Sequence, residues 1–155
     1  MAVIRLTKEF SFEAAHALEG YDGKCRHIHG HSYRLLVTVS GEPSDAGGDP
    51  KEGMTLDFGA LKSIVNDEIV ERFDHALIVR RASGGACADV CPGNALLEER
   101  FGNVVEVEYR PTCENMLTDF AGRLARRMPA GVTLHSLRLH ETATSYAEWY
   151  ASDQR

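Results

Sequence analysis

Two runs of alternating apolar and polar residues near the start of the chain predict two β-strands, at residues 3–12 and 31–41. Successive strand residues point to opposite sides, so each run places its apolar side chains on one face. These apolar positions are Ile4, Leu6, Phe10 and Phe12 in the first run, and Tyr33, Leu35, Val37 and Val39 in the second. We expect the two strands to pair antiparallel. The glycine-containing residues 13–30 between them are predicted to form a long loop.

Helical patterns appear in the middle and later parts of the chain. Residues 58–72 repeat apolar side chains every three or four positions, with Asp57 as the predicted N-cap. A second helix opens at residues 111–115 with Thr112 as its N-cap. Its apolar stripe consists of Met116, Leu117, Phe120, Leu124 and Met128. Both stripes are interpreted as core.

The remaining segments complete a predicted α+β fold. Alternation predicts strands at residues 103–109 and 132–141, and residues 142–155 are interpreted as a polar tail. Residues 80–102, rich in glycine and proline, are interpreted as an inserted loop. The result is one domain, residues 1–155, with a four-stranded antiparallel sheet and two helices on one face. The open face of such a sheet favours oligomerisation.

Composition and charge exclude some classes of protein. The chain has 155 residues, 43% of them hydrophobic, which suits one core. Its net charge of −6 argues against a nucleic-acid partner. The pattern predicts no leader segment and no membrane-spanning run, so we expect a cytoplasmic protein without a membrane partner. The four cysteines, at positions 25, 87, 91 and 113, lack a disulfide framework spacing and are expected to be free thiols.

The stretch from Cys25 to His31 carries the strongest chemical signal. If a strand begins here, His29 and His31 point to the same face and form half of a zinc site. A catalytic zinc usually has three protein ligands. His16 is favoured over His27 as the third ligand, because three alternate residues of one straight strand span too far to reach one ion. A structural site with Cys25 as a ligand remains an alternative.

Two further candidates involve carboxylates. Asp74 and His75 follow the first predicted helix, where an aspartate can orient an imidazole for proton transfer. The alternative is a local turn with a solvated histidine. Glu141 ends the apolar face of the last predicted strand, either in a pocket or at the wet edge of the sheet.

Taken together, the motifs resemble the 6-pyruvoyl tetrahydropterin synthase family, and within it the bacterial 6-carboxytetrahydropterin synthases of queuosine biosynthesis. They span nearly the whole chain in the family's order. The matching motifs are Phe12-Glu13-Ala14-Ala15-His16, Cys25-x-x-x-His29-Gly30-His31, Leu56-Asp57-Phe58, Phe73-Asp74-His75, Pro111-Thr112-x-Glu114-Asn115 and Glu141-Thr142. The 80–102 insertion, with Cys87 and Cys91, departs from the family pattern.

The resemblance implies the tunnelling fold (T-fold), in which subunits join their sheets into a barrel, as a hexamer built from two trimers. Active sites would lie at subunit interfaces. It assigns Zn²⁺ to His16, His29 and His31, and proton transfer to Cys25. Asp74 and His75 would assist proton movement. Glu141 would anchor the pterin ring, with Glu114 and Thr112 lining the same pocket.

The resemblance also implies a lyase reaction on 7,8-dihydroneopterin triphosphate, giving 6-carboxytetrahydropterin, acetaldehyde and triphosphate. The pyruvoyl product, formed without side-chain cleavage, is the nearest alternative. A zinc-dependent hydrolase and a non-catalytic pterin-binding protein are alternatives of other classes. We hypothesise that Arg80 or Arg81, with Lys24 or Arg26, binds the triphosphate of this small-molecule substrate.

Overall fold

The computed structural model describes residues 2–81 and 93–154. Within these ranges six strands form one sheet in the order β4-β3-β1-β2-β5-β6. The strands are β1 (Ile4–His16), β2 (His29–Gly41), β3 (Ala76–Arg80), β4 (Val104–Val107), β5 (Val132–His140) and β6 (Tyr146–Tyr150). The β1–β2, β2–β5 and β5–β6 pairs are antiparallel, whereas β1–β3 and β3–β4 are parallel. Cys87, Cys91 and most of the predicted insertion lie outside the described residues.

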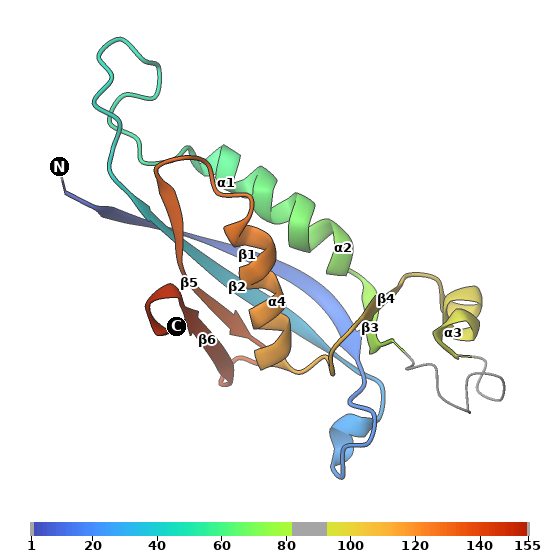
Figure 1. Ribbon diagram of the computed structural model, residues 1–155. Coiled ribbons are helices and arrows are strands. Elements are labelled where there is room, and N and C mark those ends of the chain that lie inside the picture. Colours follow the sequence, from blue (N-terminus) through green and yellow to red (C-terminus); the bar gives the residue numbers. More distant parts are fainter. Residues whose placement is uncertain (1, 82–92, 155) are drawn as a thin grey trace.

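The main helices cover one face of this sheet (Figure 1). The helical segments are η1 (Lys24–Arg26), α1 (Phe58–Val65), the π-helical η2 (Asn66–Val70), α2 (Glu71–Phe73), α3 (Gly93–Phe101), α4 (Cys113–Ala125) and η3 (Ala151–Asp153). The three segments α1, η2 and α2 follow one another without a break and confirm the first predicted helix. Helix α4 confirms the second. No helix in the described ranges is both long and apolar enough to cross a membrane.

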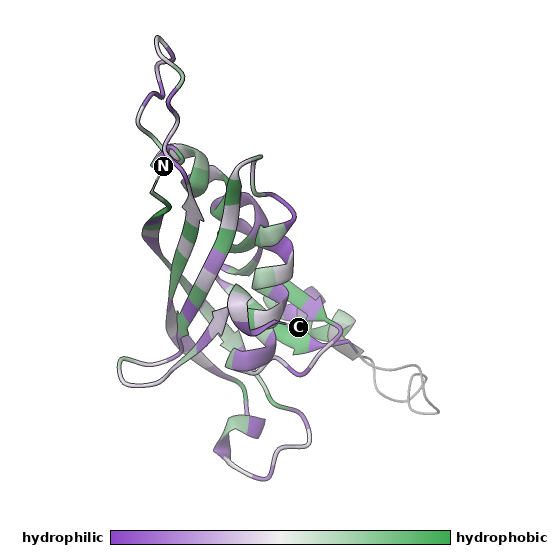
Figure 2. Cartoon of the chain, turned by 60° about the vertical axis from the view of Figure 1, so that its left-hand side comes forward, coloured by the Kyte–Doolittle hydropathy of each residue, from purple (hydrophilic) through white to green (hydrophobic). Residues whose placement is uncertain are grey.

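The core lies between the helices and the sheet. Apolar and polar residues alternate along the strands (Figure 2), and the inward residues of β1, β2 and β5 join those of α1 and α4 in one buried cluster. Phe73 at the end of α2 meets Phe120 of α4 with ring centroids 5.1 Å apart. Phe12 of β1 stacks on Tyr33 of β2 at 5.1 Å. The core thus holds both helices against β1 and β2.

The predicted four-stranded antiparallel sheet is wrong in strand number and in direction. Strand β3, residues 76–80, is a short apolar run without alternation, which is typical of a parallel strand covered on both faces. Strand β6, residues 146–150, lies in the predicted polar tail, where tyrosine and tryptophan favour a strand. Part of the predicted 80–102 loop is helix α3.

Strand β1 is also longer than predicted. It continues past Phe12 to His16, pairing residue by residue with β2, so that His16 lies opposite His29. Glutamate and alanine are weak strand formers, which hid this extension in the sequence. The connection between β1 and β2 is therefore residues 17–28, and His16 lies at the end of a strand rather than in a loop.

The face of the sheet away from the helices is polar. Hydroxyl pairs join Thr7 to Thr38 at 2.8 Å and Ser40 to Thr133 at 2.9 Å. Arg34 lies 3.6 Å from Glu9 in an exposed ion pair. We expected oligomerisation because an open sheet face buries apolar surface against a partner, but these side chains are polar. Oligomerisation therefore stays a proposal.

The N-cap of α1 yields a stability prediction. The Asp57 carboxylate accepts hydrogen bonds from the amides of Gly59 at 2.7 Å and Ala60 at 3.1 Å. An Asp57→Ala variant should lower the free energy of unfolding by about 1 kcal/mol, because both amides lose their partner. Urea unfolding monitored by circular dichroism measures this loss. Asp57→Ser keeps a capping oxygen and should stay close to wild type; an equal loss in both variants would contradict the capping role.

Candidate metal centre

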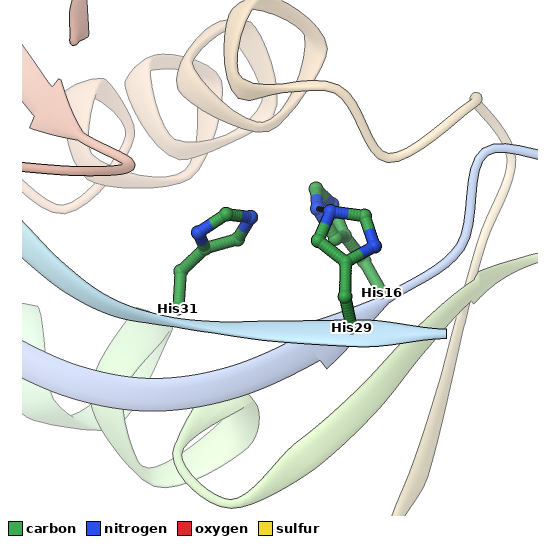
Figure 3. Close-up of side chains that lie close together, drawn as sticks. All are labelled: His16, His29 and His31. Carbon is green, nitrogen blue, oxygen red and sulfur yellow. Dashed lines mark hydrogen bonds between the residues drawn. The ribbon is translucent and has the colours of Figure 1, made fainter. Parts of the chain in front are cut away.

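Three histidines converge at one end of the β1–β2 pair (Figure 3). His16 and His29 are direct partners in the antiparallel ladder, and His31 is two residues further along β2. Directly opposite residues in such a ladder share a face, as do alternate residues of one strand. The ring centroids lie 4.5 Å apart for His16 and His29, 5.1 Å for His16 and His31, and 5.0 Å for His29 and His31.

Backbone carbonyls fix the tautomers of two of these rings. Nδ1 of His16 lies 2.7 Å from the Pro111 carbonyl oxygen, and Nδ1 of His29 lies 2.8 Å from that of His27. A carbonyl oxygen only accepts hydrogen bonds, so each Nδ1 carries the proton and each Nε2 keeps its lone pair. These Nε2 atoms face each other at 3.1 Å. Two lone pairs at this distance repel each other unless a proton or a metal ion lies between them.

The donor set fits a metal ion. One ligand atom from each of the three histidines lies within 4.8 Å of the others. Two nitrogens bound to one tetrahedral zinc stand about 3.3 Å apart, close to the spacing of His16 and His29. Nε2 of His31 is buried and has no hydrogen-bond partner. Burial lowers the pKa of both His16 and His31, which favours the neutral imidazoles that metals bind.

Glu141 lies beside this trio. Its Oε1 is 3.7 Å from Nε2 of His16 and 3.9 Å from Nε2 of His31. Its side chain is 28% exposed, so it lies in a partly enclosed position rather than at a wet edge. The backbone amide of Glu141 donates to the Ser145 carbonyl, which closes the tight turn between β5 and β6. This turn sets where the carboxylate can reach.

Several supporting groups had no signal in the sequence. The carbonyls of Pro111 and His27 orient two rings, and any residue type supplies a carbonyl. Tyr33 is fully buried on the same face of β2 as His31, with ring centroids 5.5 Å apart. Its hydroxyl lies 3.5 Å from Nδ1 of His16, and burial raises its pKa. Alternation along β2 predicted the direction of Tyr33, but not its proximity to His16.

Cys25 and His27 stand apart from the trio. Cys25 is exposed in η1, within the connection between the two strands that carry the histidines. His27 is exposed, and its Nε2 accepts a hydrogen bond from Arg26 at 3.3 Å. Among the residues that the structure describes, neither belongs to the metal-competent group. The choice of His16 over His27 thus agrees with the geometry.

Asp74 and His75 form a pair between the end of α2 and the start of β3. Nδ1 of His75 lies 3.0 Å from Asp74, and the side chains are 78% and 38% exposed, respectively. The backbone amide of Glu13 donates to Asp74 at 2.9 Å, and this bond, with the contact to His75, lowers the pKa of Asp74. His75 has a positive φ of 57°. In the described part of the chain, no hydrogen bond or ion pair joins this pair to the histidine trio.

A small cavity of about 120 Å³ lies next to Glu141. Glu114 and Cys113 line it from the first turn of α4. Thr112 is the N-cap of this helix, as predicted, and its hydroxyl accepts from the Asn115 amide at 3.3 Å. The cavity thus has a carboxylate on each of two elements.

The candidate phosphate-binding residues differ in their surroundings. Arg81 forms hydrogen bonds with Glu106 and with Glu108, so acidic partners already neutralise it. Lys24 and Arg26 are exposed and line a depression of about 300 Å³ in the connection that also carries Cys25. Asp22 also lines this depression, so an anion there would meet Lys24 and Arg26 beside one acidic side chain.

Comparison with known proteins gives a consistent result. A model of the family described as 6-pyruvoyl tetrahydropterin synthase matches residues 5–152. The 6-carboxy-5,6,7,8-tetrahydropterin synthase of Haemophilus influenzae is 36% identical over 147 residues, covering 95% of this chain and 99% of the relative. The protein of the same name from Synechocystis sp. is 44% identical over 145 residues, covering 93% and 91%.

Solved structures show the same fold. An uncharacterized protein from Wolinella succinogenes superposes with a TM-score of 0.73 at 21% identity, covering 97% of this chain and 99% of that one. The 6-pyruvoyl tetrahydropterin synthase of Caenorhabditis elegans gives 0.67 at 23% identity, covering 97% of both chains. At these identities the likeness concerns the arrangement of helices and strands.

Proposed function

Because the chain belongs to the 6-pyruvoyl tetrahydropterin synthase family, we propose that it is a 6-carboxy-5,6,7,8-tetrahydropterin synthase. The reaction would convert 7,8-dihydroneopterin triphosphate to 6-carboxytetrahydropterin, acetaldehyde and triphosphate, a step of queuosine biosynthesis. The observation that carries the proposal is the convergence of three histidine nitrogens beside the carboxylate of Glu141. Relatives bearing this enzyme's name align over more than nine-tenths of the chain.

Zinc is the metal that suits the donor set. Three neutral imidazoles suit zinc and leave a fourth position for substrate. His16, His29 and His31 would hold it, with the first two oriented by the carbonyls of Pro111 and His27. When bound, zinc supplies a Lewis acid that polarises the hydroxyls of the substrate side chain.

The two carboxylates explain recognition of a pterin. The pterin ring carries an amino group and an adjacent ring N–H, and one carboxylate accepts from both. Glu141 lies between the histidine trio and the small cavity, so a ring bound to it would present its side chain to the metal. Glu114 also lines the cavity and offers further acceptors.

A second copy of the chain would complete the site. Cys25 is exposed. Among the described residues no hydrogen bond or ion pair joins Asp74 and His75 to the histidine trio, although His75 and His31 line the same depression of about 440 Å³. The exposed His75 side chain is therefore available to a neighbouring subunit. In this arrangement Cys25 moves protons on substrate bound in its own subunit, with Asp74 and His75 of another subunit assisting. The hexameric T-fold barrel that the resemblance implies would bring such groups together.

Product analysis tests this function directly. The zinc-loaded protein is incubated anaerobically with dihydroneopterin triphosphate, the pterin is identified by mass and acetaldehyde is assayed. Acetaldehyde with 6-carboxytetrahydropterin is expected. Triphosphate release without acetaldehyde would identify the pyruvoyl reaction instead, and wild-type protein without turnover would contradict both.

The exposed basic residues yield a second prediction. A Lys24→Glu/Arg26→Glu variant should raise KM for dihydroneopterin triphosphate by about tenfold, since two charges beside the anion reverse sign. Steady-state kinetics measure the change. Arg81→Glu is the matched control, because Arg81 is already neutralised by Glu106 and Glu108. An unchanged KM in the double variant would show that Lys24 and Arg26 do not bind the triphosphate.

A further inference from the structure

The buried thiol of Cys113 links three elements around the small cavity. Its Sγ donates to the Leu139 carbonyl of β5 at 3.4 Å. The backbone amide of Ala147, on β6, is directed at the same sulfur. Leu139 and Ala147 are partners in the β5–β6 ladder. The thiol therefore ties the first turn of α4 to both strands of one hairpin.

This hairpin carries the Glu141 carboxylate in its turn. Glu141 follows Leu139 by two residues, and its amide donates to the Ser145 carbonyl at 3.1 Å. The Thr142 hydroxyl accepts from the amide of Ser145 at 3.0 Å. Glu141 is thus held directly by the turn, and the Cys113 contacts hold the two strands from which this turn projects. Its position relative to α4 depends on both.

The same thiol is next in sequence to the second carboxylate of the cavity. Cys113 precedes Glu114 in α4, and both residues line the 120 Å³ cavity together with Glu141. A sulfur contact is longer than the usual 2.8 Å of a hydroxyl bond, so a thiol keeps the helix and the hairpin further apart than a serine would. A change in this contact would therefore change the separation of Glu114 and Glu141.

The chemistry of the thiol suits a spacer rather than a reactant. Cys113 is only 8% exposed. Burial, followed by the charge of Glu141, raises its pKa to about 11. It therefore stays a neutral donor at the pH of the cell and does not compete with the exposed Cys25 as a nucleophile.

We propose that Cys113 is a positioning residue that sets the separation of Glu114 and Glu141, and thereby the fit of the pterin ring between them. The inference rests on the proposed function, because it assigns the cavity to a pterin. Cys113 acts through the two carboxylates and does not itself take part in the reaction.

Binding of neopterin, a fluorescent pterin without the triphosphate, isolates this effect. In zinc-loaded protein, Cys113→Ala removes both contacts and should raise the Kd of neopterin about tenfold, as expected for sub-ångström misplacement of binding groups. Cys113→Ser restores a donor of shorter reach, so its Kd should lie between those of Cys113→Ala and wild type. Zinc content should stay unchanged in both variants, and KM for dihydroneopterin triphosphate should rise more than kcat falls.

A core variant of the same helix separates positioning from stability. Leu124→Ala, at a fully buried position of α4, should lower Tm at least as much as Cys113→Ala and leave the neopterin Kd unchanged. Suppose that the wild-type protein turns over its substrate, and that wild type and Cys113→Ala bind neopterin with equal Kd. This result would overturn the role of Cys113 and leave the proposed function standing. A wild-type protein that neither binds neopterin nor turns over the triphosphate would overturn the proposed function, and the inference with it.

Discussion

A His16→Ala variant is expected to lose its zinc and at least about 10³-fold of its activity, because a two-histidine site neither holds the ion nor polarises the substrate. His16 is the ring on which the geometry depends. Its Nε2 lies 3.1 Å from that of His29 and 3.7 Å from Glu141, and it is 1% exposed. Metal analysis after dialysis, followed by the product assay, measures both losses.

His27→Ala is the matched control for this change. Its imidazole contacts Arg26, whereas the group that orients His29 is the backbone carbonyl of His27, which alanine retains. Zinc content should therefore match wild type, and metal binding is the readout for this control because His27 lines the same depression as Lys24 and Arg26. Thermal unfolding with and without added zinc should show a metal-dependent rise in Tm for His27→Ala and none for His16→Ala. A His16→Ala protein that binds one zinc per chain would place the metal elsewhere.

A Cys25→Ala variant should bind zinc normally and lose about 10²–10⁴-fold in turnover, the range typical of removing a proton-transfer group. Cys25 lies outside the metal-competent group, so its removal leaves the ligands in place. Single-turnover kinetics with metal-loaded protein measure the loss. A zinc-dependent hydrolase would keep most of its activity, since water would then be the nucleophile; retained activity would favour that class.

Mixed oligomers extend this test to the pair of Asp74 and His75. Cys25→Ala and His75→Ala proteins should each be inactive alone. If each site combines Cys25 of one subunit with His75 of another, unfolding and refolding the two variants together should restore part of the activity. Mixtures that stay inactive, despite confirmed subunit exchange, would place both groups in the same subunit's site.

The local pattern of apolar and polar residues was sufficient to predict those strands and helices that depend mainly on their own residues. Alternation predicted the cores of β1, β2 and β5, and the predicted caps Asp57 and Thr112 both bond amides in the first turn of their helices. Strand β3 was missed because its apolar run is short and its partners are distant in sequence. The extension of β1 to His16 was missed because pairing with β2, rather than residue preference, makes it a strand.

The site shows the same division between local and distant signals. The spacing of His29 and His31 predicted a shared face, and reach favoured His16 as their partner. The approach of Glu141 depends on the turn between β5 and β6, which the sequence analysis interpreted as the start of a tail. The Pro111 carbonyl meets His16 only because α4 begins beside the end of β1. Contacts of this kind arise from packing between elements and have no pattern along the chain.

The placement of the histidine trio also defines a compact template for protein design. Two of its members are a ladder pair, His16 with His29, and the third is His31, two residues along the same strand. Antiparallel pairing alone puts all three side chains on one face, whatever joins the strands. The same three positions can therefore be placed at the end of an unrelated two-stranded ladder, with two backbone carbonyls nearby to orient the rings. The connecting segment is then free to be exchanged for one that recognises a different substrate.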